Sequence, residues 1–175
     1  MIVPLMLVAM FLTGFAPLLG QRPVEPLAEA TLYARVLQSM PAEYADRAVL
    51  IDPLVASRPL AEAGPMGLWE RDLAAAVPSR GLNALLAAEP GRRVCRAEPD
   101  VLRCVQSAQD VYVLFGKPVV TESGVTLDVT FAGRSSESGP TFGIGTWRYT
   151  FSGAGLAESD REMVVRGHGR FAAPR

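Results

Sequence analysis

His168 is the side chain of this protein best suited to acid–base chemistry, and it is the single histidine. Imidazole is the group that most often serves as a general base near neutral pH. A glycine flanks His168 on each side, and glycines in a strand leave room for a ligand or a second backbone. In a regular strand, Arg166 and Arg170 share the face of His168 and form a cationic strip that suits a carboxylate or a phosphate. The alternative, which we favour, is a solvated face of a terminal strand whose charges protect an exposed edge.

Asp128 and Arg148 are the next candidates, because both fall on the polar faces of segments that alternate like neighbouring strands. As a functional pair they place an acid and a cation at the wall of a pocket, with Asp128 as a catalytic partner of His168 and Arg148 as a ligand contact. As a structural pair they form a cross-strand ion pair that contributes about a few tenths of a kcal/mol. We favour the ion pair.

Trp147 and Tyr149 share a face with Phe151 and alternate with polar residues. These aromatic side chains either line an apolar ligand cavity, since ligand sites are mostly apolar with few polar groups, or belong to an ordinary core. We expect core here and retain Trp147 and Tyr149 as candidate ligand contacts.

The sequence lacks the common motifs for phosphate cradling, nucleophilic catalysis and metal binding. The Gly-Ile-Gly run at 143–145 has neither a following lysine nor a helix start, so it is not a phosphate loop. No Gly-x-Ser-x-Gly elbow occurs, and the sequence places no base beside Ser135 or Ser136. The acidic residues within 158–162 lack the spacing of a calcium loop. We therefore expect no metal ion and no cofactor.

Cys95 and Cys104 are the two cysteines of the chain. Pairing of residues 96–98 with 101–103 across a turn at Pro99 and Asp100 places the cysteines opposite each other, within reach of a disulfide. A bridge that closes so short a loop stabilises by about 2–3 kcal/mol in the chain-entropy model. The alternatives are two buried free thiols or a two-cysteine metal site, and we predict the bridge.

Residues 1–20 contain no charged side chain, and the first charged residue is Arg22. An apolar run of this kind enters a bilayer or a core, and its length and position are typical of a secretory signal peptide. We expect cleavage near Gln21 and an exported domain that is periplasmic, envelope-associated or secreted, which agrees with the predicted disulfide. One alternative is a retained anchor, for which Arg22 favours a cytoplasmic domain; another is a buried helix or a misassigned start.

The formal net charge of the chain is −1, and residues 1–20 contribute no charged side chain to it. A nucleic-acid-binding surface needs an excess of cations, so we exclude nucleic acid as a partner. We expect contact with a membrane only through the N-terminal segment, if that segment is retained. The sequence identifies no other partner. About 155 residues bury one core, so we expect residues 21–175 to form a single domain.

Helical spacing is clearest in the first half of the chain. The sequence predicts one helix over Leu27–Ser39, a second from about Leu68 to Val77, and a third that Ser79 caps and that runs through Leu86. Between the first two helices, residues 47–53 read as a short strand closed by Asp-Pro, and residues 57–67 read as a loop.

Beyond Val94 the pattern alternates with a period of two. Strands are expected at 111–115, covered on both faces, at 125–131, at 145–152 and at 161–171. In the last strand, Met163 and Val165 are expected to point inward and the strip of Arg166, His168 and Arg170 outward.

Helices first and strands afterwards predict an α+β fold, in which N-terminal helices pack on one curved antiparallel sheet of four to five strands. This layout resembles the cone-shaped folds of the nuclear transport factor 2 type. The resemblance is one of element order alone.

The leading functional hypothesis is a non-enzymatic exported protein, a binding or envelope-associated domain. The alternative is a small-molecule-binding protein or a simple acid/base enzyme with a cone-shaped pocket that uses His168. An open pocket of several hundred Å³ with His168 and Asp128 at its wall favours this alternative. A third hypothesis, an anchored subunit of a larger complex, predicts an exposed apolar patch.

Overall fold

The computed structural model describes residues 24–57, 60, 76–96, 104–134 and 141–170, with the backbone alone at 141–142 and 168–170. The predicted signal peptide lies outside these residues and stays a prediction. Ser135, Ser136 and the predicted turn at Pro99 also lie outside them. Within the described residues, no helix combines the length and the apolar character needed to cross a membrane.

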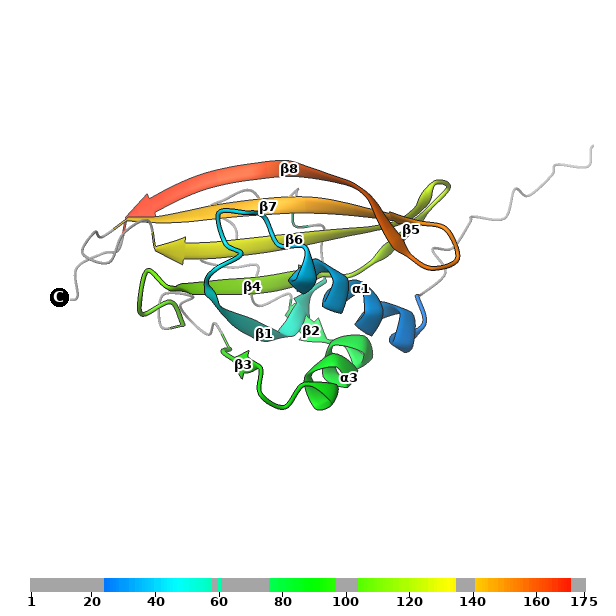
Figure 1. The fold of residues 1–175 in the computed structure, drawn as a ribbon, viewed down its shortest axis with the longest axis horizontal. Coiled ribbons are helices and arrows are strands. Elements are labelled where there is room, and N and C mark those ends of the chain that lie inside the picture. The colour runs from blue at the N-terminus through cyan, green and yellow to red at the C-terminus, as the bar shows by residue number, and fades with distance from the viewer. Residues whose placement is uncertain (1–23, 58–59, 61–75, 97–103, 135–140, 171–175) are drawn as a thin grey trace, which may run out of the picture.

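The two helices of the described residues agree with the sequence prediction (Figure 1). Helix α1 spans Pro26–Gln38, with the proline in its first turn, where a missing N–H costs nothing. Helix α3 spans Arg80–Ala88. The hydroxyl of Ser79 caps it by accepting a hydrogen bond from the amide of Leu82 at 3.1 Å.

The two helices approach each other closely because α3 has a glycine at the contact. A Cβ atom on Gly81 would clash with Glu29 and would lie 2.9 Å from the carbonyl oxygen of Pro26. The Glu29 carboxylate also accepts hydrogen bonds from the Ser79 hydroxyl at 2.8 Å and from the Gly81 amide at 3.1 Å. It therefore satisfies the N-terminus of α3, where negative charge is favoured.

All described strands belong to one eight-stranded mixed sheet. Its main path runs β2-β1-β4-β6-β7-β8, while β3 pairs with β1 and β5 pairs with β6. The bounds are β1 Ala48–Ala56, β2 Ala76–Pro78, β3 Arg93–Val94, β4 Asp110–Gly116, β5 Val119–Thr121, β6 Gly124–Arg134, β7 Thr141–Ser152 and β8 Ala157–Arg170.

The predicted fold class is wrong. The protein is α+β, but it is mostly sheet, and its sheet has eight strands in a mixed arrangement rather than four to five antiparallel ones. Strand β1 precedes α3 and pairs in parallel with β4, from Ala48 opposite Asp110 onward. Parallel neighbours need a crossover connection, and α3 lies in that connection, so helices and strands are interleaved along the chain. The cone-shaped layout is therefore not observed.

Strand β1 continues past the point where Asp52 and Pro53 are expected to end it. Its register with β4 shifts between Ile51 and Val55. Proline has no N–H to donate, and strands accept it at edges and irregularities. The sheet accommodates Pro53 by placing it within this irregularity.

Two further segments differ from the prediction. The helix expected over 68–77 is contradicted at its end, because residues 76–78 form β2 and pair antiparallel with β1; residues 61–75 lie outside the described part. The last strand begins at Ala157 rather than at Arg161, because the preceding turn occupies only 153–156.

A bulge in β8 changes which face its charged residues occupy. Met163 pairs with Trp147 and Arg166 pairs with Gly145, so Val164 is an extra residue between two regular stretches. Because Trp147 and Gly145 share one face of β7, Met163 and Arg166 share that face too. The prediction that they point to opposite faces is wrong.

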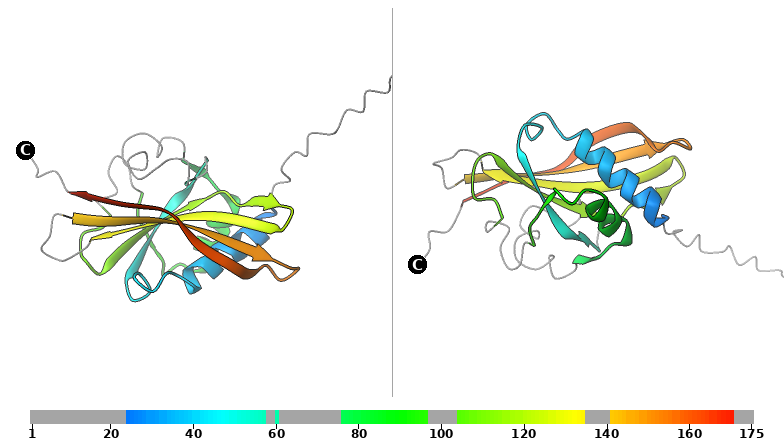
Figure 2. Two further views of the ribbon diagram at one scale, coloured as in Figure 1. Left: turned by 90° about the horizontal axis from the view of Figure 1, so that it is seen from above. Right: turned by 60° about the horizontal axis from the view of Figure 1, so that its bottom comes forward.

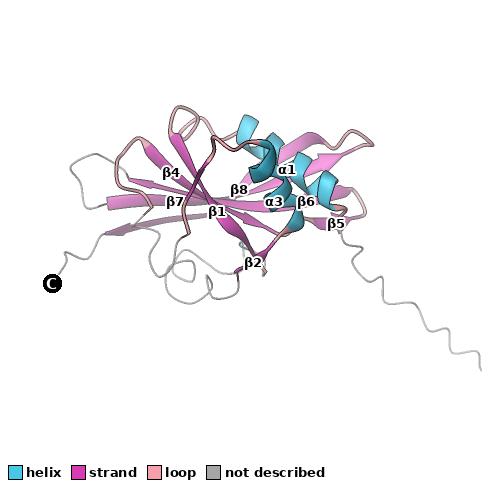
Figure 3. Cartoon of the chain, turned by 90° about the horizontal axis from the view of Figure 1, so that it is seen from below, coloured by secondary structure: helices cyan, strands magenta, loops and turns pink. Residues whose placement is uncertain are grey.

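Both helices pack on the same side of the sheet (Figure 2) and gather over the end near β5 (Figure 3). We call this side the helix face, and Val113 and Phe115 of β4 point into it. It holds the larger core, to which both helices, strands β1, β4, β6 and β7 and the connection between α1 and β1 contribute. The buried side chains of this core are Leu32, Tyr33, Val36, Leu37, Tyr44, Ile51, Val55, Leu82, Leu85, Val111, Val113, Phe115, Val125, Leu127, Val129, Phe131, Tyr149 and Phe151.

The opposite side of the sheet carries a second, smaller cluster, to which β4 contributes Tyr112 and Leu114. The prediction that β4 is covered on both faces is therefore confirmed. We call this side the disulfide face, because Cys104 is buried in it and Cys95 packs against it. Its other buried members are Ala56, Leu60, Val105, Ala132 and Ile144.

Candidate functional site

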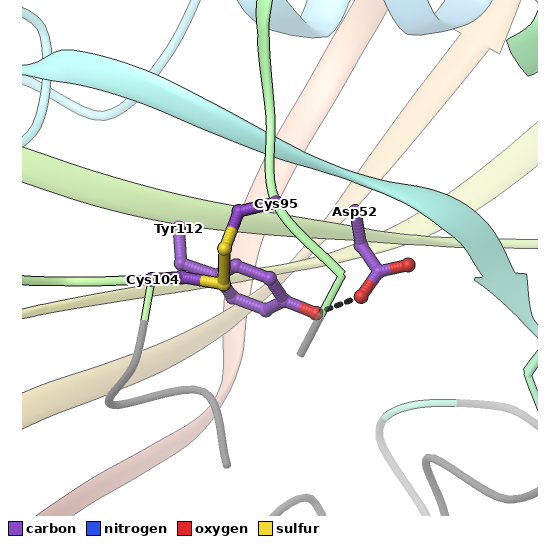
Figure 4. The surroundings of a disulfide bond; sticks show 4 residues. All are labelled: Asp52, Cys95, Cys104 and Tyr112. Carbon is purple, nitrogen blue, oxygen red and sulfur yellow. Dashed lines mark hydrogen bonds between the residues drawn. A yellow bond between two sulfur atoms is a disulfide. The ribbon is translucent and has the colours of Figure 1, made fainter. Parts of the chain in front are cut away.

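The predicted disulfide between Cys95 and Cys104 is present, with the Cα atoms 5.7 Å apart (Figure 4). Cys95 follows β3, and its amide donates a hydrogen bond to the carbonyl of Ile51 at 3.0 Å. Cys104 precedes β4. The bridge therefore links two segments that pack beside β1 and β4, at the centre of the sheet. A structural disulfide is typical of an oxidising compartment outside the cytoplasm.

Beside the bridge, the phenol of Tyr112 donates a 2.5 Å hydrogen bond to the carboxylate of Asp52 (Figure 4). Asp52 is only 2 % exposed, and it also accepts a hydrogen bond from the amide of Leu54 at 2.8 Å. Burial, together with the negative charge of Asp52, raises the pKa of Tyr112 well above its ordinary value, so the phenol stays protonated and remains a donor. We assign this pair a structural role, since a buried carboxylate requires hydrogen bonds.

The predicted pairing of Asp128 with Arg148 is confirmed. The Arg148 guanidinium donates to both oxygens of Asp128, at 2.8 and 3.1 Å, across the adjacent strands β6 and β7. Next to it, the hydroxyls of Thr130 and Thr146 share a buried hydrogen bond of 2.8 Å. These residues alternate with the apolar residues of the helix face, so they lie on the disulfide face. A bidentate pair of this kind is geometrically specific.

The aromatic stripe of β7 lies in the larger core. Tyr149 and Phe151 are fully buried, with their rings stacked 6.3 Å apart, and Trp147 packs against the same core. The guanidinium of Arg161 lies over the Tyr149 ring at 5.7 Å. Trp147 and Tyr149 do not line the cleft described next, and their role as ligand contacts stays untested.

A cleft of about 120 Å³ opens on the helix face, beyond the helices. One wall comes from the connection between α1 and β1, which crosses the sheet in front of the long strands (Figure 1) and supplies Glu43, Tyr44 and Arg47. The other walls come from Gly133 and Arg134 of β6, residues 143–144 of β7 and Arg166 of β8. The guanidinium groups of Arg47 and Arg166 and the carboxylate of Glu43 border the space, an excess of one positive charge. Arg134 contributes its backbone carbonyl, while its side chain reaches Val105 of the disulfide face.

Arg47 is held against the floor of this cleft. Its Nη1 donates to the carbonyl of Arg134 at 3.0 Å, and its guanidinium lies 5.5 Å from the ring centroid of Tyr44. A Cβ atom on Gly133 would clash with Nη1, so the glycine makes room for the guanidinium. Arg134 is anchored as well, because its Nε donates to the carbonyl of Val105 at 3.2 Å.

Arg166 is held far less tightly. Its Nη2 lies 3.4 Å from Glu43 Oε2, and the two side chains are 60 % and 41 % exposed. Tyr44, between them and the core, is buried and stacks on Phe131 with the ring centroids 5.3 Å apart. Burial, with a smaller effect of Glu43, raises the pKa of the Tyr44 phenol above its ordinary value, so Tyr44 adds no negative charge to the cleft.

His168 and Arg170 are described by their backbones only. The register places His168 opposite Gly143, which in turn lies opposite Gly133. Positions 133, 143 and 168 thus lie side by side on three adjacent strands, and the first two belong to the cleft floor. Asp128 lies five positions along β6 from Gly133 and on the other face. The backbone therefore does not bring His168 and Asp128 together, and their catalytic assignment has no support from the fold.

Sequence reasoning identified Arg166 in this region but missed Glu43, Tyr44 and Arg47. They lie in a turn without periodicity, and only the tertiary fold brings the connection across the sheet. One signal was available: glycines concentrate near the joined ends of β6, β7 and β8, at 133, 143, 145, 167 and 169. Small residues side by side on adjacent strands indicate a place where another group approaches the backbone.

A metal centre and an exposed apolar surface are two other kinds of site. Among the residues that the structure describes, no three His, Cys, Asp or Glu side chains gather as metal ligands. The exposed large apolar side chains of the same residues are Leu27, Val94 and Val120, on α1, β3 and β5 respectively. The cationic cleft is therefore the feature in the described part of the chain best suited to a ligand.

No family model, curated protein or solved structure matches the chain.

Proposed function

We propose that this protein is an exported, non-enzymatic binding domain that holds an anionic group in the cleft between Arg47 and Arg166. The export half of the proposal is supported by the disulfide and by the apolar segment 1–20, which has the pattern of a signal peptide. The domain then works in the periplasm, at the envelope or in the medium.

One observation carries the binding half: the Arg47 and Arg166 side chains, with Glu43 beside Arg166, border a cleft whose floor is glycine backbone. Guanidinium groups present a planar fork of donors that fits carboxylates and phosphates. Pockets for whole ligands usually measure about 300–1,000 Å³, so a cleft of about 120 Å³ holds a small anion or one anionic group of a larger molecule. Of the side chains that the structure describes around the cleft, the one carboxylate, Glu43, lies against Arg166, which favours binding over proton transfer.

Binding is tested by calorimetric titration of the oxidised protein with inorganic phosphate and with citrate, at constant ionic strength set by chloride. We expect at least one of these anions to bind, and we expect Arg47→Gln and Arg166→Gln each to weaken binding by about tenfold or more, since each removes a charge-assisted contact. Arg92→Gln is the matched control, because Arg92 pairs with Glu89 away from the cleft. Absence of anion binding in the parent, or equal binding by all three variants, contradicts the proposal.

Export is tested by intact-mass measurement, without reduction, on protein recovered from the envelope or the medium. We expect a mass that begins near Gln21 and is lower by the two hydrogens of one disulfide. A full-length chain recovered from the cytoplasm with free thiols contradicts the export half and leaves the binding half standing.

A further inference from the structure

We propose that the group bound in the cleft is a phosphate dianion, either a phosphate monoester or phosphate itself, and that it displaces Glu43 from Arg166 while Arg47 receives it in place. This inference rests on the proposed function and adds to it a ligand class and a built-in competitor.

Arg47 is the preorganised half of the site. Its hydrogen bond to the Arg134 carbonyl, its contact with the Tyr44 ring and its position against Gly133 fix the guanidinium from three sides. An arginine carries five N–H donors, and Arg47 also borders the cleft. A side chain that is already fixed loses little conformational freedom when an anion arrives, so Arg47 binds with a small entropic cost.

Arg166 is the releasable half. Its contact with Glu43 is long, at 3.4 Å, and both side chains are exposed by more than a third. Exposed ion pairs of this kind contribute little to stability. A dianion held at the same time by Arg47 replaces that contact at little cost. The Glu43 carboxylate therefore occupies the position on Arg166 that a ligand oxygen takes, and it lowers the affinity for anions.

The charges around the cleft favour phosphate over a carboxylate. Once Glu43 is displaced, Arg47 and Arg166 present two positive charges, which a phosphate monoester with a charge of about −1.5 to −2 at neutral pH neutralises. Three phosphate oxygens allow two arginines from different walls to bind different edges of one group. A single carboxylate has two oxygens and one charge, so it satisfies one guanidinium fork and leaves the other.

The test is calorimetric titration of the parent, Glu43→Gln, Arg166→Gln and the double variant with inorganic phosphate, and of the parent with acetate at the same ionic strength. We expect Glu43→Gln to tighten phosphate binding by about fivefold, the fold-change that corresponds to about 1 kcal/mol. We expect the Glu43→Gln effect to vanish when Arg166 is also replaced, because the competitor acts through that arginine. Acetate is expected to bind at least tenfold more weakly than phosphate.

Glu89→Gln is the matched control, since it removes one negative charge from an ion pair with Arg92 outside the cleft. It is expected to leave phosphate binding unchanged. An equal gain for Glu89→Gln and Glu43→Gln means a general effect of net charge and overturns the competitor role.

The outcomes separate this inference from the proposed function. If no variant and no anion gives binding, the proposed function fails. If phosphate binds and Arg47→Gln abolishes binding, while Glu43→Gln changes nothing or weakens it, the function stands and the competitor role is overturned. If acetate binds as tightly as phosphate, the phosphate class is overturned.

Phosphate groups reach a site outside the cytoplasm in soluble esters or in lipid headgroups, and a second probe distinguishes these sources. Vesicles of phosphatidylcholine with and without phosphatidic acid are sedimented with the protein. Co-sedimentation that requires phosphatidic acid, Arg47 and Arg166 assigns the group to a lipid headgroup. Binding of free phosphate without such co-sedimentation assigns it to a soluble phosphate.

Discussion

The two faces of the sheet are stabilised by different means. On the helix face, α1 and α3 bury a continuous core of aliphatic and aromatic side chains, among them Leu127 and Phe131. On the disulfide face, a smaller apolar cluster lies beside hydrogen-bonded polar pairs, such as Tyr112 with Asp52 and Thr130 with Thr146, and beside a covalent bridge. Strands β1, β4, β6 and β7 contribute side chains to both faces.

Among the residues that the structure describes, this difference shows two ways in which the faces of one sheet are stabilised. Burial of apolar area stabilises the helix face at about 25 cal/mol per Å². Within the described part of the chain, the disulfide face buries fewer large side chains, and the disulfide and hydrogen-bonded polar groups add to its stability. The two faces should therefore respond differently to cavities, to reduction and to the loss of a single hydrogen bond.

The largest expected effect comes from equal truncations on opposite faces. Leu127→Ala, in the larger core, is expected to lower the free energy of unfolding by about 4 kcal/mol, and Leu114→Ala, in the smaller cluster, by about 2–3 kcal/mol. The side chain removed is the same, so the difference reports how far each core can collapse around the cavity. Urea denaturation of both oxidised variants measures it. Equal costs, or a larger cost for Leu114→Ala, would show that the faces are equally well packed.

The next effect concerns the bridge. Replacing both Cys95 and Cys104 by alanine is expected to lower the free energy of unfolding by about 2–3 kcal/mol, because the unfolded chain gains the freedom of the closed loop. Thermal unfolding of protein made in an oxidising compartment measures the change, and the reduced parent is the control that keeps the native sequence. If the double variant has the same melting temperature as the oxidised parent, the bridge does not stabilise this face.

A smaller effect is expected from one hydrogen bond on the disulfide face. Tyr112→Phe removes the phenol donor from a carboxylate that is 2 % exposed, at an expected cost of about 1–2 kcal/mol. Asp52→Asn alone and together with Tyr112→Phe completes a double-mutant cycle, in which the two changes should not be additive. Strict additivity in urea denaturation would mean that the pair contributes no coupling.

The smallest effect appears only at alkaline pH and concerns the helix face. Burial raises the pKa of Tyr149 from 10.0 to about 12. Below pH 10 the phenol is protonated in both the folded and the unfolded state, so its contribution to stability is fully present. As the pH rises from 10 towards 12, the unfolded state loses its proton first and that contribution is lost.

Tyr149→Phe removes this titration, so its stability relative to the parent should rise by about 1 kcal/mol between pH 8 and pH 11. Denaturant titrations at the two pH values measure the change. A constant difference between variant and parent would mean that the Tyr149 phenol titrates in the folded state as it does in water.

Local patterns predicted what depends on local sequence. The alternation of Val111 to Phe115 predicts a strand buried on both sides, and Ser79 before a run of leucines predicts the cap of α3. The opposition of Asp128 and Arg148 follows from two adjacent alternating strands. In each case neighbouring residues carry the information, and tertiary structure only adds the partner.

The remainder of the fold depends on partners far away in sequence. Strands β2, β3 and β5 contain two or three residues each, too few for a periodic signal, and exist because a neighbouring strand pairs with them. The bulge at Val164, which moves Arg166 to the helix face, has no marker in the sequence. Glu43 and Arg47 belong to the cleft only because their connection crosses the sheet.

The parallel pairing of β1 with β4 also governs the order in which the molecule can assemble. Strand β4 begins about sixty residues after β1 in the chain, whereas β6, β7 and β8 each pair antiparallel with the strand before them. Contacts between distant segments are slow to form, because loop closure costs entropy before any contact compensates for it. A chain that emerges from its N-terminus therefore holds β1 with only the short strands β2 and β3 beside it until β4 has been made. The successive hairpins then extend the sheet to β8, and Arg166 meets Glu43 last, so the anion cleft is completed at the end of folding.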